Sequence, residues 1–167
     1  MEKTIIIING AGGVGKDTIC NMVSHHYKVI MVSSIDPIKE IAAYGGWDYT
    51  DKSHAGRKLL SDLKAAFISY NDLPTQYLIK TYENFLIDSN EILFVQIREP
   101  AEIIKFKKLV NIRCISVLIK AKRVSDKFGN SSDDRVEDYQ YDYVYNNDKP
   151  LSELERNFME FFLSIIT

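Results

Sequence analysis

The chain has 167 residues, of which 46% are hydrophobic and 26% charged, and it carries a formal net charge of -2. This length and composition suit one globular domain with a proper core. The charge excludes the basic field with which proteins hold nucleic-acid polymers. The apolar run over residues 5–8 is far too short for a membrane span or a signal sequence. The two cysteines, Cys20 and Cys114, have no metal-ligand or CxxC spacing. We therefore expect a cytoplasmic protein with reduced, buried thiols and with neither a membrane nor a nucleic-acid partner.

Strand and helix patterns alternate along the chain. Residues 4–9 form an apolar, β-branched run without polar alternation, which indicates a strand buried on both faces of a parallel sheet. The other elements that we expect are a helix over 16–26, a strand over 28–33, helices over 37–44, 54–70 and 75–88, a strand within 91–97, a helix over 100–109, strands over 112–119 and 139–145, and a helix over 151–166. No linker or repeat divides the chain. We therefore predict one α/β domain, 1–167, with a five-stranded parallel sheet.

Polar residues follow each of the five predicted strands. They include Asn9, Asp36, Arg98, Arg123 and Asn147. In open α/β sheets, ligands bind beyond the carboxyl ends of the strands. These side chains therefore predict a phosphate-handling crevice at one edge of the sheet.

The segment between the first strand and the first helix has the Walker A spacing Gly-x-x-x-x-Gly-Lys, from Gly10 to Lys16. Glycines let the backbone curl so that successive N–H groups face phosphate oxygens, and the helix N-terminus adds partial positive charge. Lys16 can then reach the β- and γ-phosphates. Strand, spacing, lysine and helix all agree, which favours this interpretation over a glycine-rich turn that binds nothing. We predict that ATP is bound by Gly10, Ala11, Gly12, Gly13, Val14, Gly15, Lys16, Asp17 and Thr18.

The residue after the lysine departs from the common pattern. A serine or threonine, whose hydroxyl binds Mg²⁺, is usual there, whereas this chain has Asp17, followed by Thr18. A carboxylate in the first turn of a helix is favourable by itself. Beside phosphates, however, an anion is repelled unless it faces a cation or a proton donor. We favour the interpretation in which Asp17 holds Mg²⁺ directly or through water.

Gly15-Lys16-Asp17-Thr18 resembles the GKDT variant of Walker A in phage-type deoxynucleoside monophosphate kinases and, as GKD, in animal-type phosphomevalonate kinases. Other segments are similar in order and spacing to nucleoside monophosphate kinase-like P-loop kinases. They are Asp36-Pro37-Ile38-Lys39 (D-P-x-K), Gly56-Arg57-Lys58-Leu59-Leu60 (GRKLL), Phe94-Val95-Gln96-Ile97-Arg98 (a strand ending in D-x-R) and Tyr141-Asp142-Tyr143-Val144-Tyr145-Asn146-Asn147-Asp148 (D-Y-V-I-x-N-D). The resemblance spans nearly the whole chain, and the P-loop is its one specific motif.

The resemblance implies a three-layer P-loop NTPase fold with a helical acceptor-binding lobe at 36–88 and a short lid-like loop at 120–137. It implies ATP and Mg²⁺ as cofactors and a small phosphorylated acceptor as partner. The acceptor would be bound by Asp36, Lys39, Arg57 and Arg98. The catalytic residues would be Lys16, Asp17, Arg98, Arg123 and Arg135. A solvated helix face explains Arg57 equally well, and ordinary loop charges explain Arg123 and Arg135.

A second departure concerns the third strand, which leads to Gln96 where the related kinases have a Walker B aspartate. An amide oxygen is a poorer partner than a carboxylate for Mg²⁺ or its waters. Asp17, Asp36 or Glu99 could supply the missing charge, or ATP could hold most of the metal.

Two function classes stay open. The first is an ATP-dependent kinase of a nucleoside or deoxynucleoside monophosphate, with phosphomevalonate or dephospho-coenzyme A as alternative acceptors. The second is a nucleotide-binding regulatory protein with weakened catalysis, which Gln96 favours. The resemblance implies that segment 146–150 touches adenine through backbone groups. The segment does not match the NKxD guanine signature, which argues against a small GTPase. Trp47 is interpreted as an aromatic cover of the lobe, and the tyrosines 139, 141, 143 and 145 as one packed face of an outer strand. The sequence does not indicate the oligomeric state.

Overall fold

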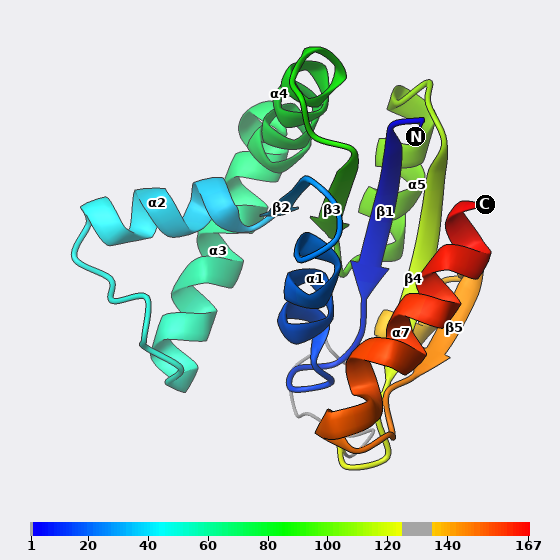
Figure 1. Cartoon of the computed structure of the whole chain (residues 1–167). Helices are drawn as coiled ribbons and strands as arrows, with labels where there is room; N and C mark the ends of the chain where they lie inside the picture. The colour runs from blue at the N-terminus through cyan, green and yellow to red at the C-terminus, as the bar shows by residue number, and fades with distance from the viewer. Residues whose placement is uncertain (1, 125–134) are drawn as a thin grey trace.

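The computed structural model describes residues 2–124 and 135–167, which form an α/β domain around one parallel sheet (Figure 1). The strands lie in the order β2-β3-β1-β4-β5. They are β1 Thr4–Asn9, β2 Val29–Ser33, β3 Ile92–Gln96, β4 Cys114–Lys120 and β5 Tyr143–Asn146. All four pairings are parallel, and β1 is central because Ile6 is registered with Phe94 of β3 and with Ile115 of β4. The predicted five-stranded parallel sheet is confirmed.

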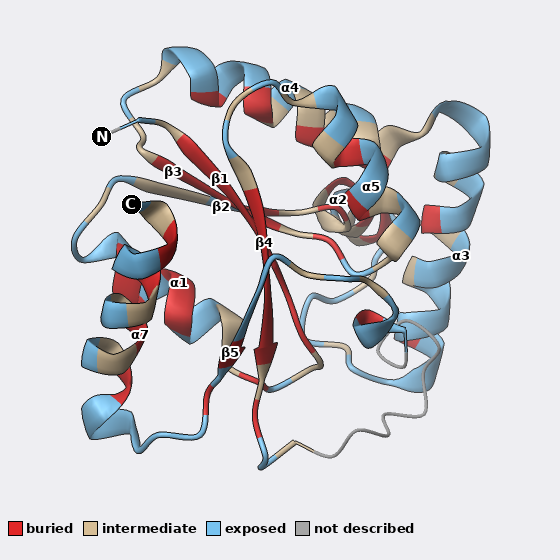
Figure 2. Cartoon of the chain, turned by 90° about the vertical axis from the view of Figure 1, so that its right-hand side faces the viewer, coloured by how far each residue is buried: buried red, intermediate tan, exposed pale blue. Residues whose placement is uncertain are grey.

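Helices cover both faces of the sheet. They are α1 Lys16–Ser24, α2 Asp36–Tyr44, α3 His54–Asn71, α4 Leu73–Ile87, α5 Pro100–Leu109, the short 3-10 helix η1 Val136–Asp138, and α7 Leu151–Ile166. Ile6 and Ile8 of β1 pack into the core shared with α1 and α7, whereas Ile5 and Ile7 pack into the core shared with α4 and α5. Both faces of β1 are therefore buried (Figure 2), which explains why its sequence shows no polar alternation.

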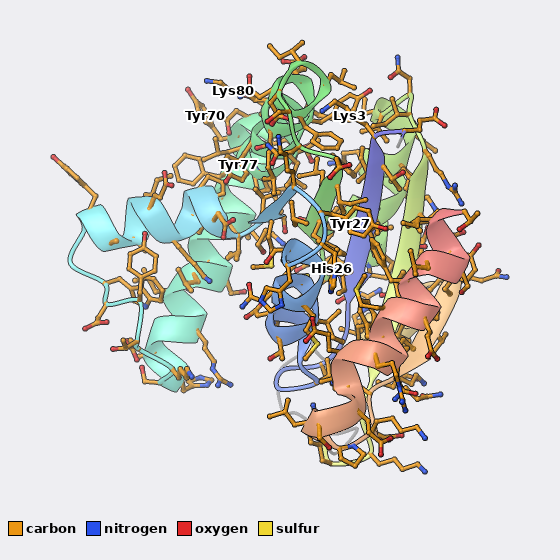
Figure 3. The ribbon with its side chains drawn as sticks, in the orientation of Figure 1. Lys3, His26, Tyr27, Tyr70, Tyr77 and Lys80 are labelled. Carbon is orange, nitrogen blue, oxygen red and sulfur yellow. The ribbon has the colours of Figure 1, made fainter. Side chains whose placement is uncertain are left out.

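The amino end of the sheet is held by a packing contact with α4, and the carboxyl end leads into the glycine-rich loop. At the amino end of β1, Lys3 (Figure 3) donates from Nζ to the carbonyl of Asp88 at 3.0 Å and lies 4.5 Å above the ring of Phe85. This contact fastens the end of α4 to the sheet. The carboxyl ends of the strands open on the opposite edge, where β1 runs into the glycine-rich loop (Figure 1).

The predicted lobe at 36–88 contains two different kinds of helix. α4 lies on the sheet and contributes Leu78, Tyr82 and Phe85 to the core, whereas α2 and much of α3 project from the body of the domain (Figure 1). In α3 only Gly56 and Lys64 are buried. Tyr77 and Lys80 lie on α4 and Tyr70 lies near the end of α3 (Figure 3). Within 36–88, therefore, α2 and α3 form the part that stands away from the sheet.

The last strand is shorter than predicted, and the interpretation of its tyrosines as one face is wrong. β5 begins at Tyr143. Tyr139 and Tyr141 precede it and pack toward the α5 side of the sheet, whereas Tyr145 packs in the α7 core. The physical reason is Asp142, whose Oδ2 accepts hydrogen bonds from the backbone N–H of Ser116 at 2.7 Å and from its hydroxyl at 2.8 Å. This side chain occupies the β4 edge, so the ladder starts one residue later.

Both cysteines are free thiols. Cys20 is buried and Cys114 is partly buried. Burial raises the pKa of both thiols, that of Cys114 to about 12. Both are therefore protonated and unreactive near neutral pH, in agreement with the sequence. Among the helices in residues 2–124 and 135–167, none has the length and apolarity needed to cross a membrane. The greater part of the predicted lid loop, 125–134, lies outside the described residues.

Candidate active site

The loop between β1 and α1 takes its shape from three glycines. Gly10, Gly13 and Gly15 have φ values of +147°, +83° and +95°, a range that side-chain-bearing residues rarely adopt. A Cβ on Gly10 would overlap the carbonyl oxygen of Ile119 on the neighbouring strand, and one on Gly15 would lie 2.7 Å from Nδ2 of Asn147. Glycine is thus required at both ends of the loop by backbone conformation and by close neighbours, as the Walker A spacing predicts.

The curled loop presents donors to its concave side. Lys16, at the first position of α1, donates from Nζ to the carbonyl oxygens of Gly10 at 2.6 Å and Ala11 at 3.0 Å. Within the part of the chain that the structure describes, the N–H groups of Ala11, Gly12 and Gly13 have no hydrogen-bond acceptor. Backbone donors, a helix N-terminus and an ammonium group gathered in this way form an anion-binding nest.

The two residues that depart from the common P-loop pattern contact each other. Nε2 of Gln96, at the end of β3, donates a hydrogen bond of 2.8 Å to Oδ1 of Asp17 in the first turn of α1. The same amide nitrogen lies 3.7 Å from the sulfur of Met31 on β2. Asp17 and Thr18 are both exposed. The second oxygen of Asp17, Oδ2, forms no hydrogen bond with any residue in 2–124 or 135–167.

A small cavity of about 170 Å³ adjoins the loop at Gly15 and Thr18, and its lining includes Arg123, Asn147 and Lys149. Arg123 donates to the carbonyl oxygens of Asn147 at 2.8 Å and Val14 at 3.1 Å. Nδ2 of Asn147, a residue only 1% exposed, also donates to the Val14 carbonyl, at 2.8 Å. These bonds fix the loop after β5 against the P-loop. The sequence indicated segment 146–150 but did not single out Asn147 as the residue that supports Gly15.

The residues predicted to bind the acceptor lie on separate elements. Asp36, at the start of α2, uses Oδ2 to accept from the N–H of Ser33 at 2.7 Å, so one of its oxygens stabilises the turn after β2. Lys39 is half-buried and Arg57 exposed, and neither side chain forms a hydrogen bond or ion pair with the rest of the described chain. Arg98 is exposed directly after β3. Its carbonyl accepts from Nδ2 of the buried Asn9, which joins the ends of β1 and β3.

Arg135 belongs with the prediction for the lid. It is exposed and pairs with Asp138 three residues later, Nε to Oδ2 at 3.3 Å. An exposed pair of this kind holds a side chain only weakly. The structure therefore brings together the loop, Lys16, Asp17 and Arg123, and it gives Lys39, Arg57 and Arg135 no contact with that group among the described residues.

Sequence reasoning missed a partly buried ion cluster between α3 and the start of α5. Nζ of Lys64 on α3 donates to Oε2 of Glu99 at 2.8 Å and to Oε2 of Glu102 at 3.0 Å. Burial, assisted by the charge of Glu99, raises the pKa of Glu102 to about 7 despite the opposing charge of Lys64. Burial also acts on Glu99, but there the charge and hydrogen bond of Lys64 win and lower the pKa. Helical spacing was the available signal, since Lys64 shares the inward face of α3 with Gly56, Leu60 and Phe67.

The oxygen atoms beside the loop are hard donors of the kind that a divalent cation such as Mg²⁺ takes. Residues 2–124 and 135–167 hold no group of three or more His, Cys, Asp or Glu side chains that could bind a metal. The donors beside the loop are the Asp17 carboxylate, the Gln96 amide oxygen and the Thr18 hydroxyl. Such a set fits Mg²⁺, which usually takes one or two protein oxygens and completes its shell with phosphate and water.

No family model matches the sequence, and neither does any curated protein. Solved structures do match the fold. The APS kinase CysC of Mycobacterium tuberculosis, in complex with AMPPNP and APS, is 11% identical with a TM-score of 0.54, over 99% of both chains. Shikimate kinase from Aquifex aeolicus is 14% identical with a TM-score of 0.55, over 98% of both chains. A gluconokinase from Sinorhizobium meliloti is 13% identical with a TM-score of 0.51, over 98% of this chain and 93% of that one.

These structural neighbours are P-loop kinases of small molecules, and the chain has their fold. At such low identity the likeness concerns the arrangement of the sheet and helices. The assignment of an acceptor rests on the residues of the site.

Proposed function

We propose that the protein is a kinase that transfers the γ-phosphoryl group of ATP to a nucleoside or deoxynucleoside monophosphate. The observation that carries the proposal is the loop from Gly10 to Lys16, with its left-handed glycines, unpaired N–H groups and inward ammonium. Fold similarity to kinases of small molecules supports it. Val14 is the residue of the loop that packs into the core, whereas the backbone N–H groups of Ala11, Gly12 and Gly13 and the Lys16 ammonium are the groups that we propose bind phosphate.

The nucleotide would lie along the loop. Its phosphates would accept hydrogen bonds from the N–H groups of residues 11–16 and from Lys16, and its base would reach the cavity lined by Thr18, Arg123 and Lys149. A divalent cation, when bound, neutralises charge on the phosphates during transfer. Asp17 would face that cation, and Lys16 would follow the charge that moves toward the transferring group.

The acceptor would lie between the sheet edge and α3. Arg98 follows β3 directly, and Lys39 and Arg57 stand on the two helices that project beside that edge. Guanidinium groups bind phosphate in bidentate geometry, so two arginines from separate elements suit an acceptor that already carries a phosphate. Arg123 and Arg135, within the lid-like loop at 120–137, are the further arginines that the resemblance assigns to the transferring phosphoryl group.

Phosphomevalonate and dephospho-coenzyme A are the alternative acceptors, because they too present a phosphate. The kinases with the same fold named above differ in their acceptors, so the fold by itself does not choose among them. A regulatory protein with weak catalysis is the alternative that Gln96 favours.

Measurement of ADP formation over a panel of acceptors tests the proposal. The panel holds the nucleoside and deoxynucleoside monophosphates, phosphomevalonate, dephospho-coenzyme A, shikimate and gluconate, with an acceptor-free reaction to measure hydrolysis. We expect turnover with at least one nucleoside monophosphate and none with shikimate or gluconate. Turnover with phosphomevalonate or dephospho-coenzyme A alone would replace the acceptor class. Tight ATP binding without turnover of any acceptor would support the regulatory alternative.

A further inference from the structure

The contact between Gln96 and Asp17 joins the two positions at which P-loop proteins usually hold their cation. In the common arrangement the helix carries a serine or threonine hydroxyl and the strand carries an aspartate. Here the helix carries the carboxylate of Asp17 and the strand carries the neutral amide of Gln96, which donates to it at 2.8 Å. The carboxylate usual on the strand is therefore found on the helix, and the strand carries a neutral polar group, as the helix usually does.

We infer that the two positions have exchanged roles: Asp17 supplies the carboxylate that faces the nucleotide-bound cation, and Gln96 is the positioning residue that orients it. The inference rests on the proposed function and deepens it. It concerns only which residue presents charge to the cation and which residue holds that charge in place.

The strand end holds Gln96 rigidly. Gln96 is paired with Ser33 of β2 and with Ile8 of β1, and its carbonyl accepts the N–H of Ser34 at 3.1 Å. Its amide lies beside the sulfur of Met31. The paired strands fix the backbone from which the Gln96 side chain starts, and the contact of its amide with Met31 on one side and Asp17 on the other places Nε2 against the carboxylate.

The hydrogen bond uses only one oxygen of Asp17. Oδ1 accepts from Gln96, whereas Oδ2 has no hydrogen-bond partner within residues 2–124 and 135–167. The carboxylate is thus oriented and keeps a free oxygen next to the phosphate-binding loop. A second aspartate in place of Gln96 would set two like charges side by side, and a neutral donor avoids that repulsion. This explains why the strand carries an amide when the helix carries an acid.

A simpler account treats Asp17 as a carboxylate that stabilises the N-terminus of α1. That account requires no particular partner on β3 and predicts no link between Asp17 and the affinity for metal-bound nucleotide. The two accounts therefore differ in a quantity that calorimetry can measure without catalysis.

The experiment measures the dissociation constant of a non-hydrolysable ATP analogue with and without Mg²⁺, and takes the ratio of the two as the metal coupling. We expect Asp17→Ser and Asp17→Asn each to lower the coupling by roughly tenfold or more while metal-free binding is kept or improved, because a negative charge beside the phosphates is removed. We expect Gln96→Leu to lower it to a smaller extent. The double variant Asp17→Ser/Gln96→Asp, which re-creates the common order, should recover most of it. Glu160→Gln removes one exposed charge on α7 and should leave the coupling unchanged.

Unchanged coupling in both Asp17 variants would overturn the inference, and so would a wild-type protein that binds the analogue equally well with and without Mg²⁺. Should the double variant fail to fold, the isosteric Asp17→Asn together with Gln96→Leu still decides the matter. Failure of the proposed function looks different, because a wild-type protein that binds no ATP analogue under any condition would remove both proposals. Normal coupling with no transfer to any acceptor would remove the proposed reaction alone.

Discussion

The region proposed to bind the nucleotide consists mainly of backbone groups, whereas the region proposed to bind the acceptor consists mainly of long charged side chains. The loop from Gly10 to Lys16 offers backbone N–H groups and connects the fully buried strand β1 to α1, whose inner face is buried. The opposing part, α2 and α3, offers charged side chains on helices that project from the sheet, and its α3 buries only Gly56 and Lys64. On the proposed function, the first region would bind the phosphates that all nucleotides share, and the second would distinguish one acceptor from others.

This difference has a structural consequence. A site made of backbone amides needs a fixed chain path, so its glycines are demanded by φ values and by close neighbours such as Ile119 and Asn147. A site made of long side chains needs only suitable positions, and the side chains of Lys39 and Arg57 form no hydrogen bonds or ion pairs with the described residues. Substitutions should therefore have large, general effects on the first side and smaller, acceptor-specific effects on the second.

The largest effect is expected from Lys16→Ala. Removal of the ammonium should weaken ATP binding and lower kcat by roughly a hundredfold or more, because the Lys16 ammonium is the positive charge that we propose faces the phosphates. The melting temperature should stay near that of the wild type. Lys108→Ala, at an exposed position on α5, is the matched control and should behave as wild type. Calorimetric ATP binding and initial rates measure both effects, and retained turnover in Lys16→Ala would remove the P-loop assignment.

A pair of glycines compares the two regions directly. Gly15 and Gly46 have nearly equal φ values of +95° and +94°, but a Cβ on Gly15 meets Asn147, whereas one on Gly46 meets no atom within 4 Å. Substitution by alanine should cost about 1–2 kcal/mol of folding free energy from backbone strain at either position. Only Gly15→Ala should also displace Asn147 and weaken ATP binding by about tenfold, a loss of roughly 1.4 kcal/mol.

Denaturant titration and calorimetry separate the two contributions. An equal loss of ATP affinity in both variants would mean that the lobe also shapes the nucleotide site. That result would contradict the distinction between the glycine-rich loop and the α2/α3 part.

The glycine-rich loop could be predicted well from the sequence, whereas contacts between side chains distant in the sequence could not. Walker A spacing encodes a chain path, so strand, loop and helix followed from residues 4–16 alone. The hydrogen bond from Gln96 to Asp17 joins residues 79 positions apart, and the sequence patterns around these two residues do not predict it. Lys64 is a similar case, since its partners Glu99 and Glu102 come from another element. The predicted strand 139–145 began too early. Its alternating tyrosines have the period of a strand, but Asp142 accepts a hydrogen bond from Ser116 at the edge of β4.

On the acceptor side, Arg57→Ala should raise the KM for the acceptor by about tenfold or more, because one charge-assisted hydrogen bond is worth roughly 1.5–3 kcal/mol. ATP affinity should not change. Lys58→Ala is the control on the adjacent residue, whose side chain pairs with Asp62 on the solvent side. Steady-state kinetics with the best acceptor of the panel provide the test. Equal effects of the two substitutions on KM would show that Arg57 is only part of a solvated face, and a loss of ATP affinity would assign Arg57 to the nucleotide site instead.

The smallest effect concerns the ion cluster that joins α3, on the acceptor side, to the start of α5. The pKa of Glu102 is raised to about 7 by burial and by the charge of Glu99, against the opposing charge of Lys64. A carboxyl whose pKa is higher in the folded than in the unfolded state stabilises the fold while it is protonated in both states, and this contribution is lost as pH rises through its folded pKa. The lowered pKa of Glu99 acts in the opposite direction, but only in more acidic solution.

Wild-type protein should therefore lose stability between about pH 5 and pH 8 relative to Glu102→Gln, which keeps the shape of the side chain and leaves Lys64 with one carboxylate. The difference between the two melting curves should change by roughly 2–4 °C over that range, the shift that about 1 kcal/mol produces in a domain of this size. Glu160→Gln, on the exposed face of α7, controls for a general effect of net charge. A constant difference across the range would mean that Glu102 is ionised throughout, stabilised by Lys64. The junction between α3 and the sheet would then be a fixed ion pair without pH sensitivity.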